Sequence, residues 1–194
     1  MLVFRFFRIP IRIDFGFFAT VGFMLLTSDE SLVLTVLLVC LLHEIGHLSV
    51  MAAFGIPLKR IEFHGAGIKI VPENKALPFR QELFLLCGGC AVNLILFVAT
   101  VFCNSRNVLV FSAINLILLC FNLIPAEFFD GGRILLLISE GTAAERGVYI
   151  FVKYIAPITV AVFAVWLFFY FDVGITAVIT LFYFLMASFI REFS

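Results

Sequence analysis

The sequence contains few charged residues and no excess of either sign. Only 13% of its 194 residues are Asp, Glu, Lys or Arg, and 13 basic side chains balance 13 acidic ones. This balance gives no indication of a nucleic acid or another polyanion as a partner. Histidine occurs three times, too few for the histidine clusters of membrane desaturases. The sequence also has no internal repeat, no low-complexity tract and no stretch long enough for a separate soluble domain.

A disulfide framework is not expected either. The chain has five cysteines, an odd number, and every one of them lies inside an apolar segment. Cys87 and Cys90 form a C-G-G-C motif, but one such motif is weak evidence for a metal or redox site. Small residues that allow two helices to pack closely are the favoured explanation.

Apolar side chains are what the sequence has in abundance. Hydrophobic residues make up 63% of it, and the mean hydropathy is +1.18, whereas soluble domains are about 45–50% apolar. The sequence therefore predicts an integral, multi-pass membrane protein. The arginine-containing N-terminus is followed by further apolar runs and lacks a small-residue cleavage site, so we expect it to be a retained first span.

Six apolar runs approach the roughly 20 residues that a helix needs to cross the hydrocarbon core. They cover about 13–28, 31–54, 81–103, 108–126, 150–171 and 173–190. We therefore expect an all-α fold of about six transmembrane helices in a single domain, 1–194, with core spans at about 31–54, 81–103 and 108–130. The connector at 61–71 alternates apolar and polar residues around "GAG", which predicts two short strands. These strands are either a simple hairpin or an exposed edge that pairs with substrate backbone.

The distribution of Lys and Arg predicts the orientation of these spans. With the N-terminus inside, every Lys and Arg except Arg106 falls on the cytoplasmic face, as the positive-inside rule requires. We therefore expect both termini to be cytoplasmic, in the cell membrane of a bacterium.

The segment "LLHEIGHLSV", residues 41–50, places ionisable groups inside the second span. Its H-E-x-x-H spacing puts His43 and His47 on one helix face, where both can bind one metal ion, with Glu44 beside them to act on water. Buried polar groups that pair with other helices, or axial haem ligands, are the alternatives, but intramembrane ionisable residues are functional by default. His47 lies seven residues before Phe54, or about 10 Å from the inner end of the span.

A catalytic zinc ion takes three protein ligands and leaves a fourth position for water, so a third ligand is required. Val50 and Ala53 stand where the extended histidine signature requires Gly and His. The remaining histidine, His64, is expected to be a polar residue in a strand or turn.

Asp130 is the favoured third ligand. Pro125 should disrupt the fourth span near its inner end, and Gly131 and Gly132 should free the backbone after the carboxylate, so that it can turn inward. Glu127 is the rival ligand. Helix N-capping is the alternative role for Asp130.

Three motifs of the sequence together resemble the site-2 proteases, a family of intramembrane zinc metalloproteases. "HEIGH" fits the zinc motif of the family's second span, and "GGCAVN" resembles the glycine-plus-asparagine motif of its third span. "NLIPAEFFDGGRIL" resembles its late proline and Asp-Gly motif. The motifs occur in the family's order on adjacent spans, which makes the resemblance far more specific than H-E-x-x-H alone.

The resemblance implies that His43, His47 and Asp130 bind one zinc ion and that Glu44 is the general base. It also implies an enzyme that cleaves membrane-tethered proteins within the lipid bilayer during regulated intramembrane proteolysis, and it suggests a membrane regulatory partner. A non-catalytic membrane scaffold that has kept the protease fold, and a metal- or haem-binding membrane protein, are the rival functions. An intact Glu44 argues against a scaffold, since a scaffold has no need of the base.

Two residues depart from the family pattern. Cys90 stands where the third-span motif usually has proline, and Phe128 stands where proline commonly precedes the Asp-Gly pair. The six-span plan with a short second connector resembles the sporulation factor IV branch, which cleaves a membrane-tethered precursor of a sigma factor. Many members of that branch carry a C-terminal CBS domain, which we do not expect here because the sequence ends at "REFS".

Asn93 and Asn122 are the remaining polar candidates inside the predicted spans. Either side chain could hydrogen-bond the substrate backbone or the developing oxyanion. Hydrogen bonding between helices is at least as good an explanation for both.

Overall fold

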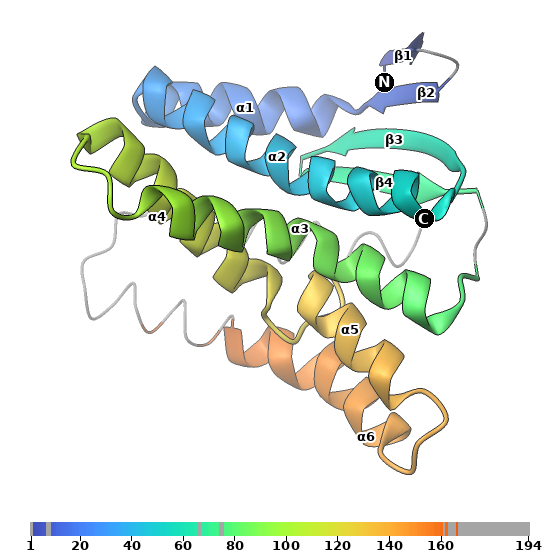
Figure 1. The fold of residues 1–194 in the computed structure, drawn as a ribbon. Coiled ribbons are helices and arrows are strands. Elements are labelled where there is room, and N and C mark those ends of the chain that lie inside the picture. The colour runs from blue at the N-terminus through green and yellow to red at the C-terminus, as the bar shows by residue number, and fades with distance from the viewer. Residues whose placement is uncertain are drawn as a thin grey trace. The chain divides into compact units, whose positions relative to one another are not determined.

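The computed structural model is mostly helical, with one small sheet (Figure 1). It describes residues 2–6, 9–65, 67–73, 76–160, 162 and 166. The chain divides into two compact units, residues 1–123 and 124–194. The first unit contains, in order, β1 (Leu2–Phe6), β2 (Ile9–Ile13), α1 (Phe15–Thr27), α2 (Glu30–Phe54), β3 (Leu58–His64), β4 (Gly67–Pro72), α3 (Phe79–Thr100) and α4 (Arg106–Asn122). The second contains α5 (Asp130–Ser139), α6 (Glu145–Ile150) and a π-helix (Phe151–Ile155).

Two helices of the described residues are long and apolar enough to cross a membrane. They are α2, with 25 residues, and α3, with 22, which at 1.5 Å per residue exceed the roughly 30 Å hydrocarbon core. The other two apolar helices, α1 and α4, have 13 and 17 residues and fall short of that thickness. The six-span arrangement is therefore not confirmed. The last predicted span, 173–190, lies outside the described residues, as does most of 150–171 beyond residue 160.

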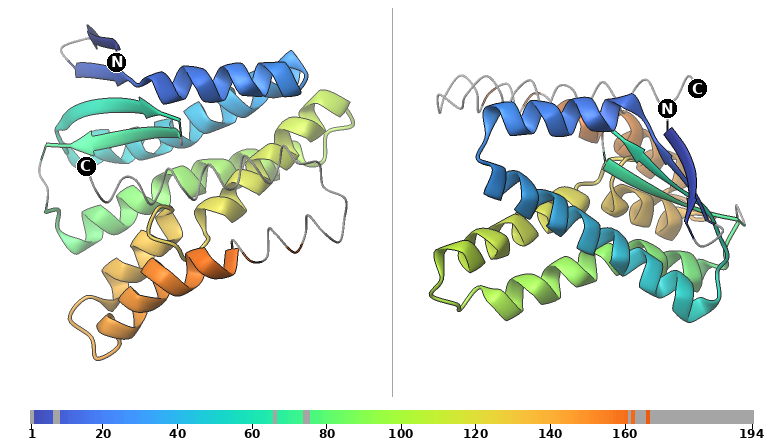
Figure 2. Two further views of the ribbon diagram at one scale, coloured as in Figure 1. Left: turned by 180° about the vertical axis from the view of Figure 1, so that it is seen from behind. Right: turned by 90° about the horizontal axis from the view of Figure 1, so that it is seen from above.

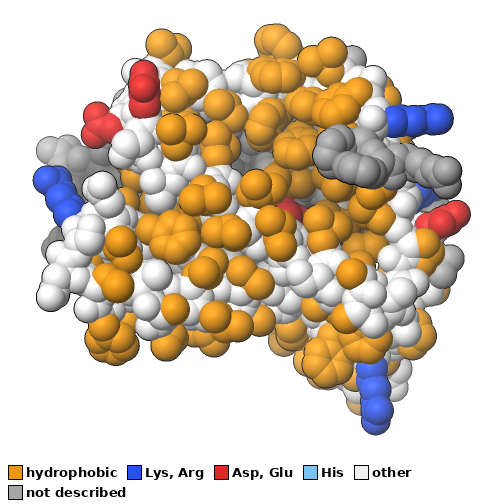
Figure 3. All heavy atoms as spheres, turned by 45° about the horizontal axis from the view of Figure 1, so that its top comes forward, with side chains coloured by type: hydrophobic (Ala, Val, Ile, Leu, Met, Phe, Trp, Pro, Cys, Tyr) orange, Lys and Arg blue, Asp and Glu red, His pale blue; other side chains and the backbone are white. Residues whose placement is uncertain are grey.

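Large apolar side chains are exposed along both long helices. They include Leu34, Leu38, Leu41 and Ile45 on α2 and Leu94, Ile95 and Val98 on α3. Figure 3 shows a face on which hydrophobic side chains predominate, while most of the coloured charged groups lie near its margins. Soluble proteins rarely expose apolar patches of this extent, so these helix faces suit a lipid environment.

The sheet has the strand order β1-β2-β3-β4 (Figures 1 and 2). β3 and β4 form the antiparallel hairpin that the alternation at 61–71 predicted. The hairpin of β1 and β2 was not predicted, and β2 pairs in parallel with β3. The prediction of an all-α fold with one hairpin-like connector was therefore too simple, because the N-terminal segment extends that hairpin into a four-stranded sheet.

The sheet packs beside the C-terminal part of α2 through a small buried cluster. Met51, Ile56 and Leu85 form its centre, and Leu58 and Ile70 from the sheet pack against it. Gly55 caps the C-terminus of α2, and its left-handed backbone (φ 65°) lets the chain turn directly into this cluster. The turn anchors the segment of α2 that carries the H-E-x-x-H motif.

α2 and α3 approach each other at two facing glycines. A Cβ atom built on Gly46 would lie 2.4 Å from the carbonyl oxygen of Gly88, and one on Gly88 would lie 2.8 Å from that of Gly46. Contacts this short exclude any side chain at either position. The small residues of the C-G-G-C segment therefore serve close helix packing, as the sequence predicted.

The second unit has a helix directly after the turn that contains Pro125. Asp130 begins α5, and Gly131 and Gly132 are buried inside that helix. A Cβ on Gly132 would lie 2.1 Å from the carbonyl oxygen of Ala126. The prediction that the glycines free the backbone was wrong, because Gly132 serves a close approach of the preceding turn.

Candidate metal centre

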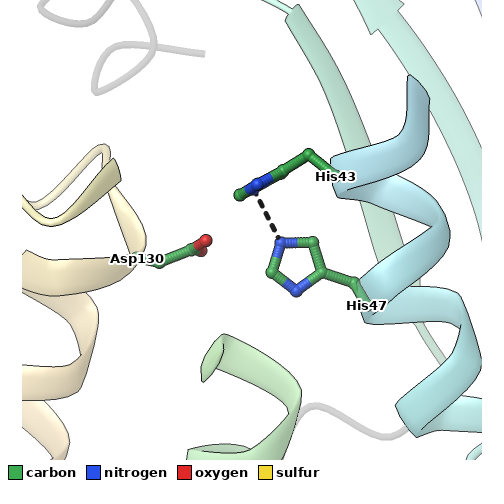
Figure 4. A group of neighbouring side chains, drawn as sticks. All are labelled: His43, His47 and Asp130. Carbon is green, nitrogen blue, oxygen red and sulfur yellow. Dashed lines mark hydrogen bonds between the residues drawn. The ribbon is translucent and has the colours of Figure 1, made fainter. Parts of the chain in front are cut away.

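His43 and His47 lie one helical turn apart on α2, with 5% and 9% of their surfaces exposed. The i, i+4 spacing directs both rings to the same side of the helix. Their Nε2 atoms approach to 3.1 Å, and the rings meet edge to face (Figure 4). The side chains thus converge as the motif predicted.

The other nitrogen of each ring faces a group on α3. The Nδ1 atom of His47 lies 2.7 Å from the backbone oxygen of Leu85. A carbonyl oxygen only accepts hydrogen bonds, so this Nδ1 carries the proton and Nε2 of the neutral ring keeps its lone pair. The Nδ1 atom of His43 lies 3.2 Å from Oδ1 of Asn93. α3 therefore supplies an outer partner to each histidine.

Gly89 on α3 makes room for these rings. A Cβ at this position would lie 2.5 Å from Nε2 of His43 and 2.6 Å from Nε2 of His47. Any side chain larger than that of glycine would therefore displace the imidazoles. The sequence showed the glycine pair of the third span, but nothing in it separated the role of Gly89 from that of Gly88.

Asp130, the favoured third ligand, belongs to the second unit and is buried, with 8% of its surface exposed. Its role as a ligand, like that of its rival Glu127, remains a prediction. Asp130 is the first residue of α5, while Phe129 occupies the N-cap, so Asp130 is not the N-cap.

The donor set fits zinc. Two imidazole nitrogens and a carboxylate oxygen are ligands that zinc takes in proteins, and three protein ligands leave one position open. A tetrahedral ion with Zn–N distances of about 2.0–2.1 Å requires its two nitrogens to lie about 3.3–3.4 Å apart. The Nε2 separation of 3.1 Å is close to this requirement.

The other predicted polar residues lie on α2, α3 and α4. Glu44, the residue after His43, is half-buried on α2. Asn122, at the end of α4, donates from Nδ2 to the backbone oxygen of Leu118 in its own helix at 3.0 Å. The roles predicted for Glu44, Asn93 and Asn122 remain predictions.

His64 is the last residue of β3, in agreement with its prediction as a polar strand residue. Its Nε2 atom lies 3.3 Å from Glu62, which also accepts a hydrogen bond from Arg60 and lies 3.8 Å from Arg12. Burial raises the pKa of Glu62, but the hydrogen bonds and charges of Arg60 and His64 outweigh it and bring the pKa below the usual 4.5. Glu62 therefore belongs to a local ion-pair cluster on the sheet.

No family model matches this chain, but comparison with known proteins finds similar chains. Stage IV sporulation protein FB of Bacillus subtilis (strain 168) is 29% identical over 121 residues, which are 59% of this chain and 42% of that protein. The match thus spans less than half the length of this relative. A site-2 protease from Methanocaldococcus jannaschii shares the fold, with a TM-score of 0.64, 24% identity, and coverage of 94% of this chain and 91% of that chain.

These similarities confirm the resemblance to the site-2 protease family that the three motifs predicted. The curated relative is itself a stage IV sporulation protein, in agreement with the predicted branch.

Proposed function

We propose that this chain is an intramembrane zinc metalloprotease, and that it hydrolyses a peptide bond in or near a transmembrane segment of a membrane-tethered protein. The convergence of the Nε2 atoms of His43 and His47 at 3.1 Å carries the proposal. The fold shared with a site-2 protease supports it. A precursor of a transcription or sigma factor is the substrate class that the family resemblance implies.

His43, His47 and Asp130 would hold one zinc ion in this proposal. The chemistry that zinc supplies when bound is polarisation of the scissile carbonyl and a water that loses its proton near neutral pH. Glu44 accepts that proton and passes it to the leaving amine. Asn122 and Asn93 are the candidate donors to substrate backbone or oxyanion.

The orientation of the chain decides where a substrate is cut. We propose that both termini and the sheet are cytoplasmic, since all Lys and Arg except Arg106 then lie inside. His47 is seven residues from Phe54, the cytoplasmic end of α2, or about 10 Å by helical rise. The cut should therefore map to the cytoplasmic end of the substrate's span. Reporter fusions at Ser28 and Asn104 should both give an external signal, and a cytoplasmic signal from either contradicts this orientation.

Catalysis is tested by co-expression of the chain with candidate membrane-tethered substrates, followed by mass spectrometry of the products. Glu44→Gln should keep stoichiometric zinc and lose cleavage by roughly 100- to 10,000-fold, because the base is removed while the ligands remain. Glu30→Gln, at the exposed start of the same helix, is the matched control and should cleave like the wild type. If the substrate is cut at the wild-type rate in the presence of Glu44→Gln, this chain does not supply the base for the cleavage. That result would contradict the proposed enzymatic activity and favour a scaffold.

The third ligand is tested by measuring bound zinc in purified variants. Asp130→Ala should weaken zinc binding more than the roughly 10- to 100-fold that is typical of losing an outer partner. Glu127→Ala should leave it unchanged. The reverse result would make Glu127 the ligand.

A further inference from the structure

Asn93 is a fully buried side chain in the middle of α3, with 0% of its surface exposed. Its Oδ1 atom faces Nδ1 of His43 at 3.2 Å. Within the part of the chain that the structure describes, its Nδ2 atom has no hydrogen-bond partner. Burying an amide group without a partner costs free energy. The side-chain contact that the described structure shows for Asn93 is the one with His43.

The two histidines differ in how their proton positions are set. His47 faces the backbone oxygen of Leu85 at 2.7 Å, and a backbone oxygen can only accept. His43 faces a carboxamide, which accepts through oxygen and donates through nitrogen. The Nδ1 proton of His47 thus faces the backbone, whereas Nδ1 of His43 faces a side chain that a substitution can replace.

This difference bears on metal binding because the Nε2 atoms lie only 3.1 Å apart. With the lone pair of His47 fixed on Nε2, a neutral His43 has two choices. It can donate its own Nε2 proton to His47, or it can carry the proton on Nδ1 and present a second lone pair. Only the second tautomer leaves both Nε2 atoms able to bind a metal ion.

We propose that Asn93 is a positioning residue of the metal centre. Its Oδ1 atom accepts the Nδ1 proton of His43 and thereby holds the Nε2 lone pair of that ring toward the metal. Outer partners of this kind fix the tautomer and the orientation of ligating histidines in metal sites. The inference rests on the proposed function, since it assumes that His43 is a ligand.

Three variants test this role. Asn93→Leu is nearly isosteric and removes the acceptor, Asn93→Asp keeps the acceptor and loses the donor, and Asn115→Leu is the matched control. Asn115, on α4, is equally buried, at 0% exposed, and its Oδ1 atom has no hydrogen-bond partner among the described residues. Its Nδ2 atom donates to the backbone oxygen of Phe111 in its own helix. The measured quantity is the zinc dissociation constant of each purified protein in competition with a chelating indicator.

We expect Asn93→Leu to bind zinc about 10- to 100-fold more weakly than the wild type. Asn93→Asp should bind at least as tightly, because a carboxylate only accepts and so favours the Nδ1 tautomer of His43. Asn115→Leu should bind like the wild type. Wild-type affinity in Asn93→Leu would overturn the inference, and so would weakened binding in Asn93→Asp or equal losses in Asn93→Leu and Asn115→Leu.

A second measurement separates positioning from a merely structural role. Nitrogen chemical shifts of histidine in the zinc-free protein report which ring nitrogen carries the proton. The His43 ring should lose its preference for the Nδ1 proton in Asn93→Leu and keep it in Asn93→Asp and Asn115→Leu. If Asn93→Leu does not fold, the affinity and tautomer of Asn93→Asp decide the question. A wild-type protein that binds no zinc would contradict the proposed function instead.

Discussion

The chain carries two groups of histidine with nearby acid, and they differ in the partners that surround them. His43 and His47 are buried in α2, and the partners shown for their Nδ1 atoms are neutral: a backbone oxygen and an amide. His64 stands on the sheet with 32% of its side chain exposed, beside a glutamate that Arg60 and Arg12 also face. A neutral acceptor at Nδ1 leaves Nε2 of each ring available for a metal ion. In the sheet, by contrast, the negative charge of the glutamate is paired with arginines.

The comparison teaches that the partners of a histidine reveal more than the presence of an acid nearby. Both groups contain imidazole and carboxylate, but only His43 and His47 direct two nitrogens at one point, 3.1 Å apart. In the sheet, Glu62 is shared among three basic side chains. These differences support the proposal that the first group binds a metal ion, whereas the second stabilises the sheet locally.

The largest difference in zinc affinity should appear when one histidine of each group is replaced by alanine. His47→Ala removes a ligand and should lower zinc affinity by more than about 100-fold, since loss of an outer partner alone costs about 10- to 100-fold. His64→Ala should change it by no more than about twofold, as expected of a substitution away from the site. Zinc content after dialysis measures both. Comparable losses in the two variants would remove the distinction between the groups.

A smaller effect is expected from Gly89→Ala, which fills the space beside the rings. The added Cβ meets the tips of His43 and His47 at about 2.5 Å, so the rings must swing away while the helix stays folded. Returning the rings to their metal-binding positions against the added Cβ is overpacking, which costs about 1–3 kcal/mol, and 1.4 kcal/mol is about tenfold in affinity. Zinc affinity should thus fall roughly 10- to 100-fold.

Gly22→Ala in α1 is the matched control, because a Cβ there meets nothing within 4 Å. It should leave zinc affinity unchanged. Thermal unfolding of the zinc-free proteins should show no loss of stability in Gly89→Ala, since alanine favours a helix over glycine by about 1 kcal/mol. Unchanged zinc affinity in Gly89→Ala would contradict the prediction that a Cβ at this position displaces the two imidazole rings.

The smallest effect should follow Glu62→Gln in the sheet. The folded pKa of Glu62 lies below 4.5, so its contribution to stability is present above the unfolded pKa and is lost as pH falls through the folded pKa. The variant should be less stable than the wild type at pH 7, by about 1 kcal/mol or less, and the difference should shrink at acid pH. Unfolding midpoints at pH 7 and in acid measure this, with exposed Glu73→Gln as control. A difference that grows in acid would contradict the direction of the shift.

The sequence predicted those parts of the site that depend on local spacing. The i, i+4 separation of His43 and His47 is sufficient to place both rings on one face, whatever the rest of the fold. The role of Gly89 could not be predicted, because it depends on how close α3 comes to α2. Asp130 was proposed as a ligand for its chemistry, and that role stays a prediction, but the glycines after it misled the prediction of local structure.

The sheet shows a similar division. The hairpin at 61–71 follows from local alternation, and the same alternation is present in "IPIRI" at 9–13. No strand was predicted there, since the parallel partner of that segment, β3, is separated from it by two helices. Pairings across such distances leave no local signal in the sequence.

The parallel pairing of β2 with β3 also constrains the order of events during synthesis. Ile11 pairs with Ile61, so the N-terminal hairpin cannot join the sheet until α1 and α2 have both emerged from the ribosome. Until then, β2 exposes an unpaired edge, and such edges favour association between chains. Closing a loop of this length is also entropically unfavourable, so a slow step in biogenesis should be the docking of the first 13 residues onto a helix pair that is already in place.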